Sequence, residues 1–136
     1  LKRSPQQSVI LAAQFGLERS TPKQVKEKMD QFTAHRKRTQ PPGASTGSVF
    51  KNPPGDYAGR LIEAAGLKGK RVGGVEVSNL HANFFVNDQN ASAKDYYELI
   101  QIVRSKVEQK FGVRLELEVE LIGDWNGSNP SGEMAA

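Results

Sequence analysis

The chain of 136 residues contains no cysteine and only two histidines. Without cysteine it can form no disulfide bond, thiolate nucleophile or cysteine metal site, which fits the reducing cytoplasm. The histidines, His35 and His81, lie far apart and have no companions at metal-ligand spacing, so we expect no metal site. The sequence also has no apolar run of about 18 to 20 residues and no apolar leader, so we expect a cytoplasmic protein that does not span a membrane.

The composition predicts one soluble globular domain with an excess of positive charge. Hydrophobic residues make up 37% of the chain, and 136 residues suffice for one compact domain with its own core but hardly for two. The formal net charge of +4 favours an anionic partner, which could be a nucleotide, a nucleic acid or a lipid headgroup. The charge alone does not choose among these partners.

The first two predicted elements are a strand and a surface helix. Residues 8–17 form an apolar run, which predicts a buried strand whose partner is not close in sequence. The Ser20-Thr21-Pro22 tripeptide is a helix-start signal, and residues 23–39 carry a thin apolar stripe among many charges. Near the end of this helix, Arg36, Lys37 and Arg38 either complement the helix dipole or lie near the diphosphate of a nucleotide.

The middle of the chain alternates between loops and short elements. Residues 40–47 are rich in proline, glycine and serine, which predicts a connecting loop. Residues 57–65 have apolar positions at helical spacing and are followed by Gly66, which is typical of a helix cap. Residues 69–87 indicate extended structure that is interrupted by a turn or bulge at Gly73-Gly74, where another backbone segment approaches closely.

The last third of the chain has the clearest periodicity. A capping box, Ser92-Ala93-Lys94-Asp95, opens a helix with one apolar face that ends at Gly112. Residues 113–121 alternate between apolar and charged side chains, which predicts a half-buried strand. Residues 124–136 are polar and aperiodic, so we expect a disordered tail. The fold class is therefore predicted to be α+β, with a small sheet packed by helices.

One stretch has the character of an active-site wall. Residues 47–53 read GSVFKNP, and a hydroxyl, a cation and an amide lie between Gly47 and Pro53. Glycine can adopt backbone angles that are closed to other residues, whereas proline fixes its own φ. Val49 and Phe50 can anchor the segment in a core while the polar side chains remain available to a ligand. Alternatively, the stretch is an ordinary loop in which the serine caps an element and the lysine is solvated.

The GSVFKNP string resembles the signature of UDP-N-acetylenolpyruvoylglucosamine reductase, also called UDP-N-acetylmuramate dehydrogenase, a bacterial flavoenzyme of cell-wall precursor synthesis. Three further blocks follow in the order of that family: AGRLIEAAGLKGKRVGG at residues 58–74, VSNLHANFFVN at residues 77–87 and FGVRLELEVELIG at residues 111–123. Together the four blocks cover most of the chain.

The resemblance implies that this chain is the C-terminal, substrate-binding half of a two-part enzyme. Residues 1–18 would be the trailing strand of an FAD-binding half that precedes Leu1, and residues 19–123 the substrate-binding domain. NADPH would reduce FAD, and the flavin would pass hydride to the enolpyruvyl ether of a UDP-sugar. The family's catalytic arginine would also lie upstream, so we expect the fragment alone to be inactive. The short link between residues 53 and 61 indicates the subgroup without a substrate-covering tyrosine loop.

The resemblance also assigns roles to five residues. The serine of the signature, here Ser48, would protonate carbon 2 of the reduced substrate, and the second glutamate of L-E-x-E-V, here Glu118, would stabilise the intermediate or relay its proton. Asn52 resembles a residue that hydrogen-bonds the diphosphate region, and Lys51 would add charge there. His81 lies near a further polar substrate contact of the family. Without the resemblance, Glu118 is a solvated strand residue and His81 a loop histidine.

Two other functions remain open at this point. The chain is alternatively a small basic module that binds nucleic acid through residues 23–38, although no aromatic side chains interleave with that basic run as a stacking platform would require. A third possibility is a relative of the reductase domain that has kept the fold and lost the activity. The presence of both Ser48 and Glu118 argues against it.

Overall fold

The computed structural model describes residues 11–122, which fall into two compact units divided between Ala34 and His35. The elements follow one another as one long helix, a strand, a short helix, three strands and a second long helix. None of the helices in residues 11–122 has the length and apolar character needed to cross a membrane.

The prediction of a buried strand at residues 8–17 is wrong for the part that the structure describes. Residues 11–17 form no strand, and Leu11, Phe15 and Leu17 are largely exposed. An apolar run forms a strand only where a neighbouring edge supplies hydrogen-bond partners, and these residues pair with no edge among residues 11–122.

Helix α1, Pro22–Thr39, confirms the predicted surface helix. The N–H of Gln24 donates to the hydroxyl of Thr21, and the Gln24 side chain accepts from the Thr21 N–H, both at 3.3 Å. These two bonds satisfy backbone groups that the first turn leaves without helical partners. None of the residues in α1 is buried, so its thin apolar stripe lies on the surface.

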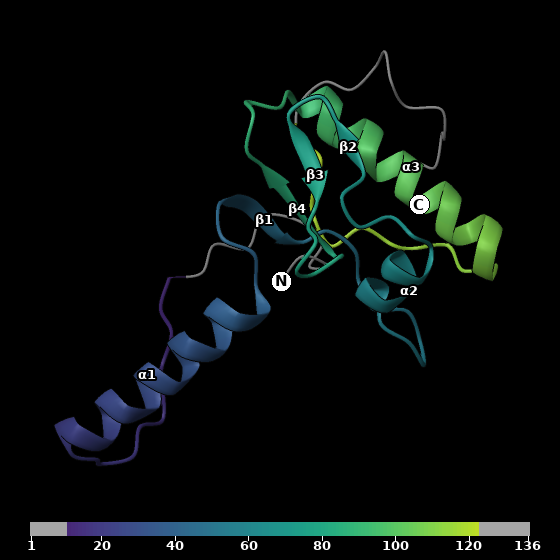
Figure 1. Ribbon diagram of the computed structural model, residues 1–136. Coiled ribbons are helices and arrows are strands. Elements are labelled where there is room, and N and C mark those ends of the chain that lie inside the picture. The colour runs from purple at the N-terminus through teal and green to yellow at the C-terminus, as the bar shows by residue number, and fades with distance from the viewer. Residues whose placement is uncertain (1–10, 123–136) are drawn as a thin grey trace. The chain divides into compact units, whose positions relative to one another are not determined.

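A four-stranded antiparallel sheet forms the centre of the second unit (Figure 1). The strand order is β1-β4-β3-β2, and the strands are β1, Ala44–Ser48; β2, Arg71–Val72; β3, Val75–Val77; and β4, Phe84–Asn87. The prediction of a loop throughout residues 40–47 is therefore wrong at its end, where β1 begins. Pairing with β4 outweighs the low strand propensity of the Ala-Ser-Thr-Gly-Ser sequence.

The Gly73-Gly74 pair joins β2 to β3, as the sequence predicts. Gly73 has a φ of +50°, which glycine adopts at little cost. A Cβ atom on Gly74 would lie only 2.3 Å from the Gln89 carbonyl oxygen, so the backbone after β4 does approach this turn closely. Beside the turn, Arg71 pairs with both Glu76 and Asp88, and its guanidinium lowers the pKa of Asp88.

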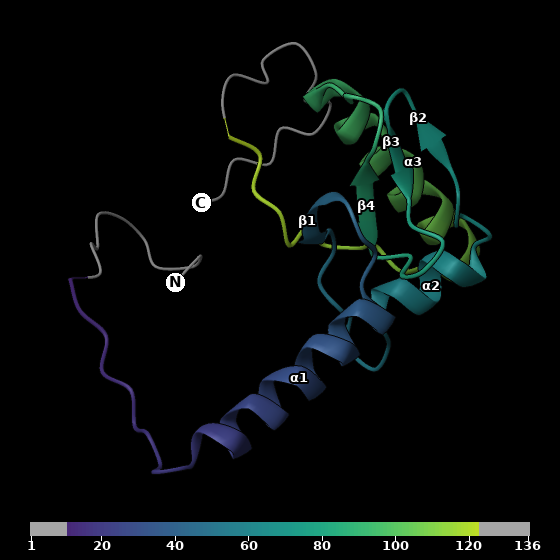
Figure 2. The same cartoon turned by 60° about the vertical axis from the view of Figure 1, so that its left-hand side comes forward.

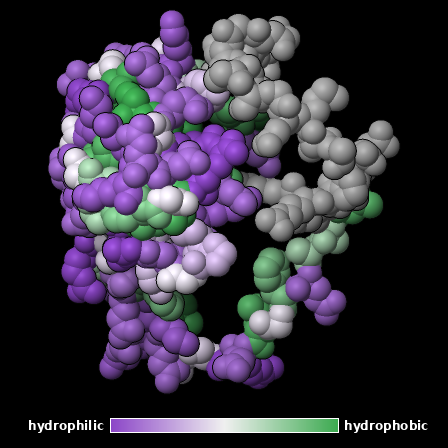
Figure 3. All heavy atoms as spheres, turned by 90° about the vertical axis from the view of Figure 1, so that its right-hand side faces the viewer, coloured by the Kyte–Doolittle hydropathy of each residue, from purple (hydrophilic) through white to green (hydrophobic). Residues whose placement is uncertain are grey.

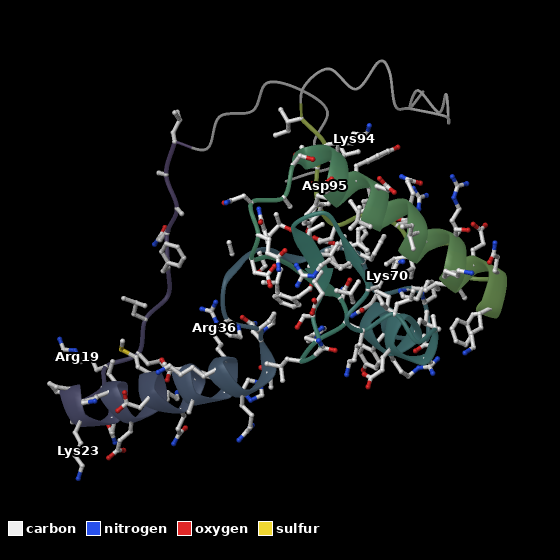
Figure 4. All side chains as sticks on the ribbon, turned by 45° about the horizontal axis from the view of Figure 1, so that its top comes forward. Arg19, Lys23, Arg36, Lys70, Lys94 and Asp95 are labelled. Carbon is white, nitrogen blue, oxygen red and sulfur yellow. The ribbon has the colours of Figure 1, made fainter. Side chains whose placement is uncertain are left out.

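One helix covers the sheet, and a second helix packs on the first and closes the core. Helix α3, Ala93–Phe111, lies across one face of the sheet (Figure 2), and helix α2, Ala58–Ala64, packs against it. The predicted capping box at Ser92 is present, with Lys94 and Asp95 in the first turn of α3 (Figure 4), and Gly112 ends the helix at a φ of +67°. The core contains Val49, Phe50, Ala58, Leu61, Ile62, Leu67, Val75, Val77, Ala82, Phe85, Leu99, Ile100, Val103, Val107 and Leu115.

Residues 113–121 keep the predicted alternation of burial but do not form the predicted continuous strand. Leu115 is buried and Leu117 and Val119 are partly buried, whereas Leu121 is 40% exposed. The segment makes a single antiparallel bridge, between Leu117 and Phe50. The pairing is short because its partner segment is confined between Gly47, with a φ of +84°, and Pro53, which cannot donate a backbone hydrogen bond.

These elements confirm the predicted α+β class with a small sheet packed by helices. The face of the molecule seen in Figure 3 is mostly hydrophilic, with small apolar patches between polar side chains. The predicted disorder of residues 124–136 lies outside the described residues.

Candidate functional site

A cavity of about 450 Å³ lies where the end of β1, the start of α2 and the loop before β4 meet. This volume is within the usual range for small-molecule sites. Three of the five residues singled out in the sequence, Ser48, Asn52 and His81, line it. The remaining lining residues are Tyr57, Gly59, Arg60, Glu63, Leu80, Ala82 and Asn83.

Ser48 is the last residue of β1, and the chain around it has a fixed course. The register between β1 and β4 shifts between Ser45 and Ser48, and Gly47 supplies the left-handed conformation at this irregularity. The next two residues, Val49 and Phe50, are buried, as the sequence predicts. The Ser48 side chain is therefore held at the cavity wall by a buried anchor directly after it.

Asn83 provides that anchor with hydrogen bonds. Its side-chain oxygen accepts from the Phe50 N–H at 3.0 Å, and its amide nitrogen donates to the Phe50 carbonyl at 2.8 Å. Its backbone carbonyl accepts from the Val49 N–H at 2.9 Å. With only 3% of its surface exposed, Asn83 acts as a buried clamp on the segment that follows Ser48. Asn83 was not predicted from the sequence, although its polar side chain directly before the apolar run at residues 84–86 was a usable signal.

Asn52 connects the same segment to helix α2. Its side-chain oxygen accepts from the Ala58 N–H at 3.0 Å, at the first residue of the helix. Because the oxygen is used in this way, the amide NH₂ group is the part of Asn52 that can donate to a ligand oxygen. That geometry suits an anionic or carbonyl ligand in the cavity.

His81 also lines the cavity, from a tight turn before β4. The buried Ser78 hydroxyl accepts from the N–H groups of Leu80 and His81, and the His81 carbonyl accepts from the Phe84 N–H. The imidazole packs edge-on against the Phe84 ring, with centroids 4.8 Å apart. These contacts hold the ring in place at the cavity.

Lys51 and Glu118 are not among the residues lining this cavity. The Lys51 ammonium pairs with Glu116 at 2.9 Å on the surface. The Glu118 N–H donates to the Val49 carbonyl at 2.8 Å, which brings its backbone opposite the residue that follows Ser48. The substrate-binding role of Lys51 and the catalytic role of Glu118 stay predictions.

Charged side chains that the sequence did not single out lie in α2 and just before it. Arg60 pairs with Asp56, and this bond together with the Tyr57 N–H lowers the pKa of Asp56 to about 2. Glu63, which also lines the cavity, pairs with Lys68 at 2.7 Å. The cavity lining therefore contains charges of both signs, at Arg60 and Glu63, and neutral hydrogen-bonding groups at Ser48 and Asn52.

Comparisons with known proteins identify the family to which this chain belongs. Residues 38–122 match the family model described as UDP-N-acetylenolpyruvoylglucosamine reductase, C-terminal domain. The UDP-N-acetylenolpyruvoylglucosamine reductase of Chloroflexus aggregans is 54% identical over 114 residues, covering 84% of this chain and 38% of the relative. UDP-N-acetylenolpyruvoylglucosamine reductase 2 of Bacillus cereus is 52% identical over 117 residues, covering 85% and 38%.

A solved structure agrees with these relatives. The crystal structure of UDP-N-acetylenolpyruvylglucosamine reductase from Thermus caldophilus superposes with a TM-score of 0.66 at 42% identity, covering 77% of this chain and 37% of that one. The chain thus spans 38% of the length of the curated relatives it matches.

Proposed function

Because the chain belongs to the UDP-N-acetylenolpyruvoylglucosamine reductase family, in which it corresponds to the C-terminal domain, we propose that it is the substrate-binding and proton-donating part of such an enzyme. The reaction would convert UDP-N-acetylglucosamine enolpyruvate to UDP-N-acetylmuramate, a step of peptidoglycan precursor synthesis in the cytoplasm. The observation that carries the proposal is the cavity that brings Ser48, Asn52 and His81 together.

The cofactors would be FAD and NADPH. When bound, the flavin would supply the hydride that reaches the enolpyruvyl group. The chain spans only 38% of the length of its relatives, so we place both cofactor sites mainly in the remainder of the enzyme and assign none of the described residues to them.

Within this domain, Ser48 would hold the proton for carbon 2. A serine hydroxyl is a weak acid, so it can serve only if the substrate anion is strongly basic and the geometry is fixed. The clamp from Asn83 to Phe50 and the irregular end of β1 supply that fixed geometry. Asn52 would donate its NH₂ group to the diphosphate, with Lys51 adding positive charge nearby.

A binding experiment tests this function against nucleic-acid binding. We expect the chain to bind UDP saturably by calorimetry, and Asn52→Asp to weaken that binding about 10-fold or more, because a carboxylate replaces the donor and repels phosphate. The carboxylate would still accept from the Ala58 N–H, so the thermal stability should be retained. Binding of RNA or DNA that falls steeply with salt, without UDP binding, would instead identify a nucleic-acid module.

Glu118 gives a second test, with Glu116 as its matched neighbour. In a full-length reductase carrying this domain, we expect Glu118→Gln to slow the substrate half-reaction by about 10²-fold, the usual scale for a general acid or base. Glu116→Gln should be nearly silent, since Glu116 pairs with Lys51 on the surface and exposed ion pairs contribute little. Stopped-flow measurement of the substrate half-reaction in the two variants tests this assignment. A larger effect of Glu116→Gln would show that the catalytic glutamate is Glu116 and that the assignment is displaced by two residues.

A further inference from the structure

The imidazole of His81 accepts a hydrogen bond at one of its two nitrogens. The N–H of Asn83 donates to His81 Nδ1, with 3.3 Å between the two nitrogens. Since a backbone N–H can only donate, Nδ1 must be the acceptor nitrogen. In a neutral imidazole the other nitrogen, Nε2, then carries the hydrogen.

Helix α2 presses on the same edge of the ring. Gly59 faces it, and a Cβ atom at this position would lie 3.2 Å from His81 Cε1 and 3.5 Å from Nδ1. The first distance is shorter than an ordinary van der Waals contact, so any larger residue would displace the ring by a few tenths of an ångström. Glycine at position 59 lets the ring reach the Asn83 N–H.

We propose that Asn83 and Gly59 are positioning residues that fix His81 as the neutral Nε2–H tautomer, so that the cavity presents an N–H donor to an acceptor oxygen of the nucleotide-sugar. Asn83 thereby positions two parts of the cavity lining. Its side chain bonds to the segment after Ser48, and its backbone N–H bonds to His81. The choice of ligand in this proposal rests on the proposed function. The tautomer itself rests only on the contacts of the ring.

The tautomer can be measured in the chain as it is, without catalysis. Nitrogen-15 NMR of the imidazoles, recorded above the ordinary histidine pKa of about 6.5, separates protonated from unprotonated ring nitrogens. We expect His81 to show an unprotonated Nδ1 and a protonated Nε2. His35, which is exposed on α1, is the internal control and should show a mixture. An Nδ1–H form or a mixture at His81 would overturn the proposal.

Gly59→Ala tests the positioning role without removing a buried hydrogen bond. Alanine favours a helix over glycine, so the variant should fold, while its methyl group displaces the ring. We expect the His81 signals to move toward the His35 pattern before any ligand is added. Affinity for UDP-N-acetylglucosamine, which carries both candidate acceptors, should fall about 5- to 10-fold, the scale of one hydrogen bond. Ala64→Gly, an exposed site in the same helix, should leave the His81 signals unchanged.

Titration with UDP and with UDP-N-acetylglucosamine locates the acceptor oxygen. A shift of the His81 Nε2–H signal with UDP alone would place the acceptor on the diphosphate or uridine, and a shift with the second ligand only would place it on the sugar. Binding that leaves this signal unmoved, or a Gly59→Ala variant that keeps both the tautomer and the affinity, would refute the donor role. If neither ligand binds while the tautomer is as expected, the proposed function fails and the tautomer assignment stands.

Discussion

Replacing Ser48 with alanine is expected to slow the reoxidation of reduced flavin by the UDP-sugar by roughly 10²- to 10⁴-fold in a full-length reductase that carries this domain. Reduction of the flavin by NADPH should keep its rate, because the hydroxyl is proposed to act on the substrate and not on the nucleotide. The loss of one oxygen atom from a partly exposed side chain should leave the fold intact. Stopped-flow absorbance of the flavin measures the two half-reactions separately.

Ser45→Ala is the matched control for this experiment. Ser45 lies on the same strand, pairs in the same ladder with β4 and is exposed, so its substitution changes the chemistry of β1 without reaching the cavity. It should leave both half-reactions unchanged. If Ser48→Ala slowed both half-reactions equally, the serine would be a structural residue and the proton donor would have to be sought elsewhere.

Replacing Gly74 with alanine is expected to lower the free energy of unfolding by about 2–3 kcal/mol, the cost of overpacking a tight site. The added Cβ would lie 2.3 Å from the Gln89 carbonyl oxygen and 2.5 Å from the Ala91 nitrogen. Both are backbone atoms, and the Gly74 carbonyl accepts from the N–H groups of Asp88 and Gln89 at 3.3 Å. The methyl group can fit only if the β2-β3 turn separates from the segment that leads into α3.

Gly66→Ala separates this crowding from the cost of backbone conformation. Gly66 has a φ of +75° and open space where its Cβ would be, so alanine there should cost only about 1 kcal/mol, the left-handed penalty of a single residue. Urea denaturation of the two variants and the wild type gives the comparison. A Gly74→Ala variant that is no less stable than Gly66→Ala would contradict this prediction. It would mean that the backbone at residues 88–91 can move away from the added methyl group at little cost in free energy.

The elements that the sequence predicted well are those whose signals are local. The capping box at Ser92, the apolar face of α3 and the left-handed Gly112 are all decided within one or two helical turns. The Gly73-Gly74 turn is likewise read from neighbouring residues, because few other residues adopt that conformation. The GSVFKNP signature, read together with three further blocks, was sufficient to indicate the family that the comparisons then established.

The elements that the sequence predicted poorly depend on partners far along the chain. Residues 44–48 form a strand only because β4 lies beside them, and residues 113–121 make a single bridge because the segment at Phe50 offers only a short edge. Residues 11–17 form no strand because, among residues 11–122, they pair with no edge. Composition cannot reveal the presence or length of such an edge.

By itself, the sequence determined the helices, the glycine turn, the α+β class and the family, since each follows from side-chain period, backbone conformation or a contiguous motif. Only the tertiary structure decided which polar groups share a cavity. Asn83 lies 33 positions from Phe50 in the chain, yet its side-chain amide pairs with both backbone groups of that residue. Hydrogen bonds between such distant residues form only after the sheet and α2 have packed, so no local pattern encodes them.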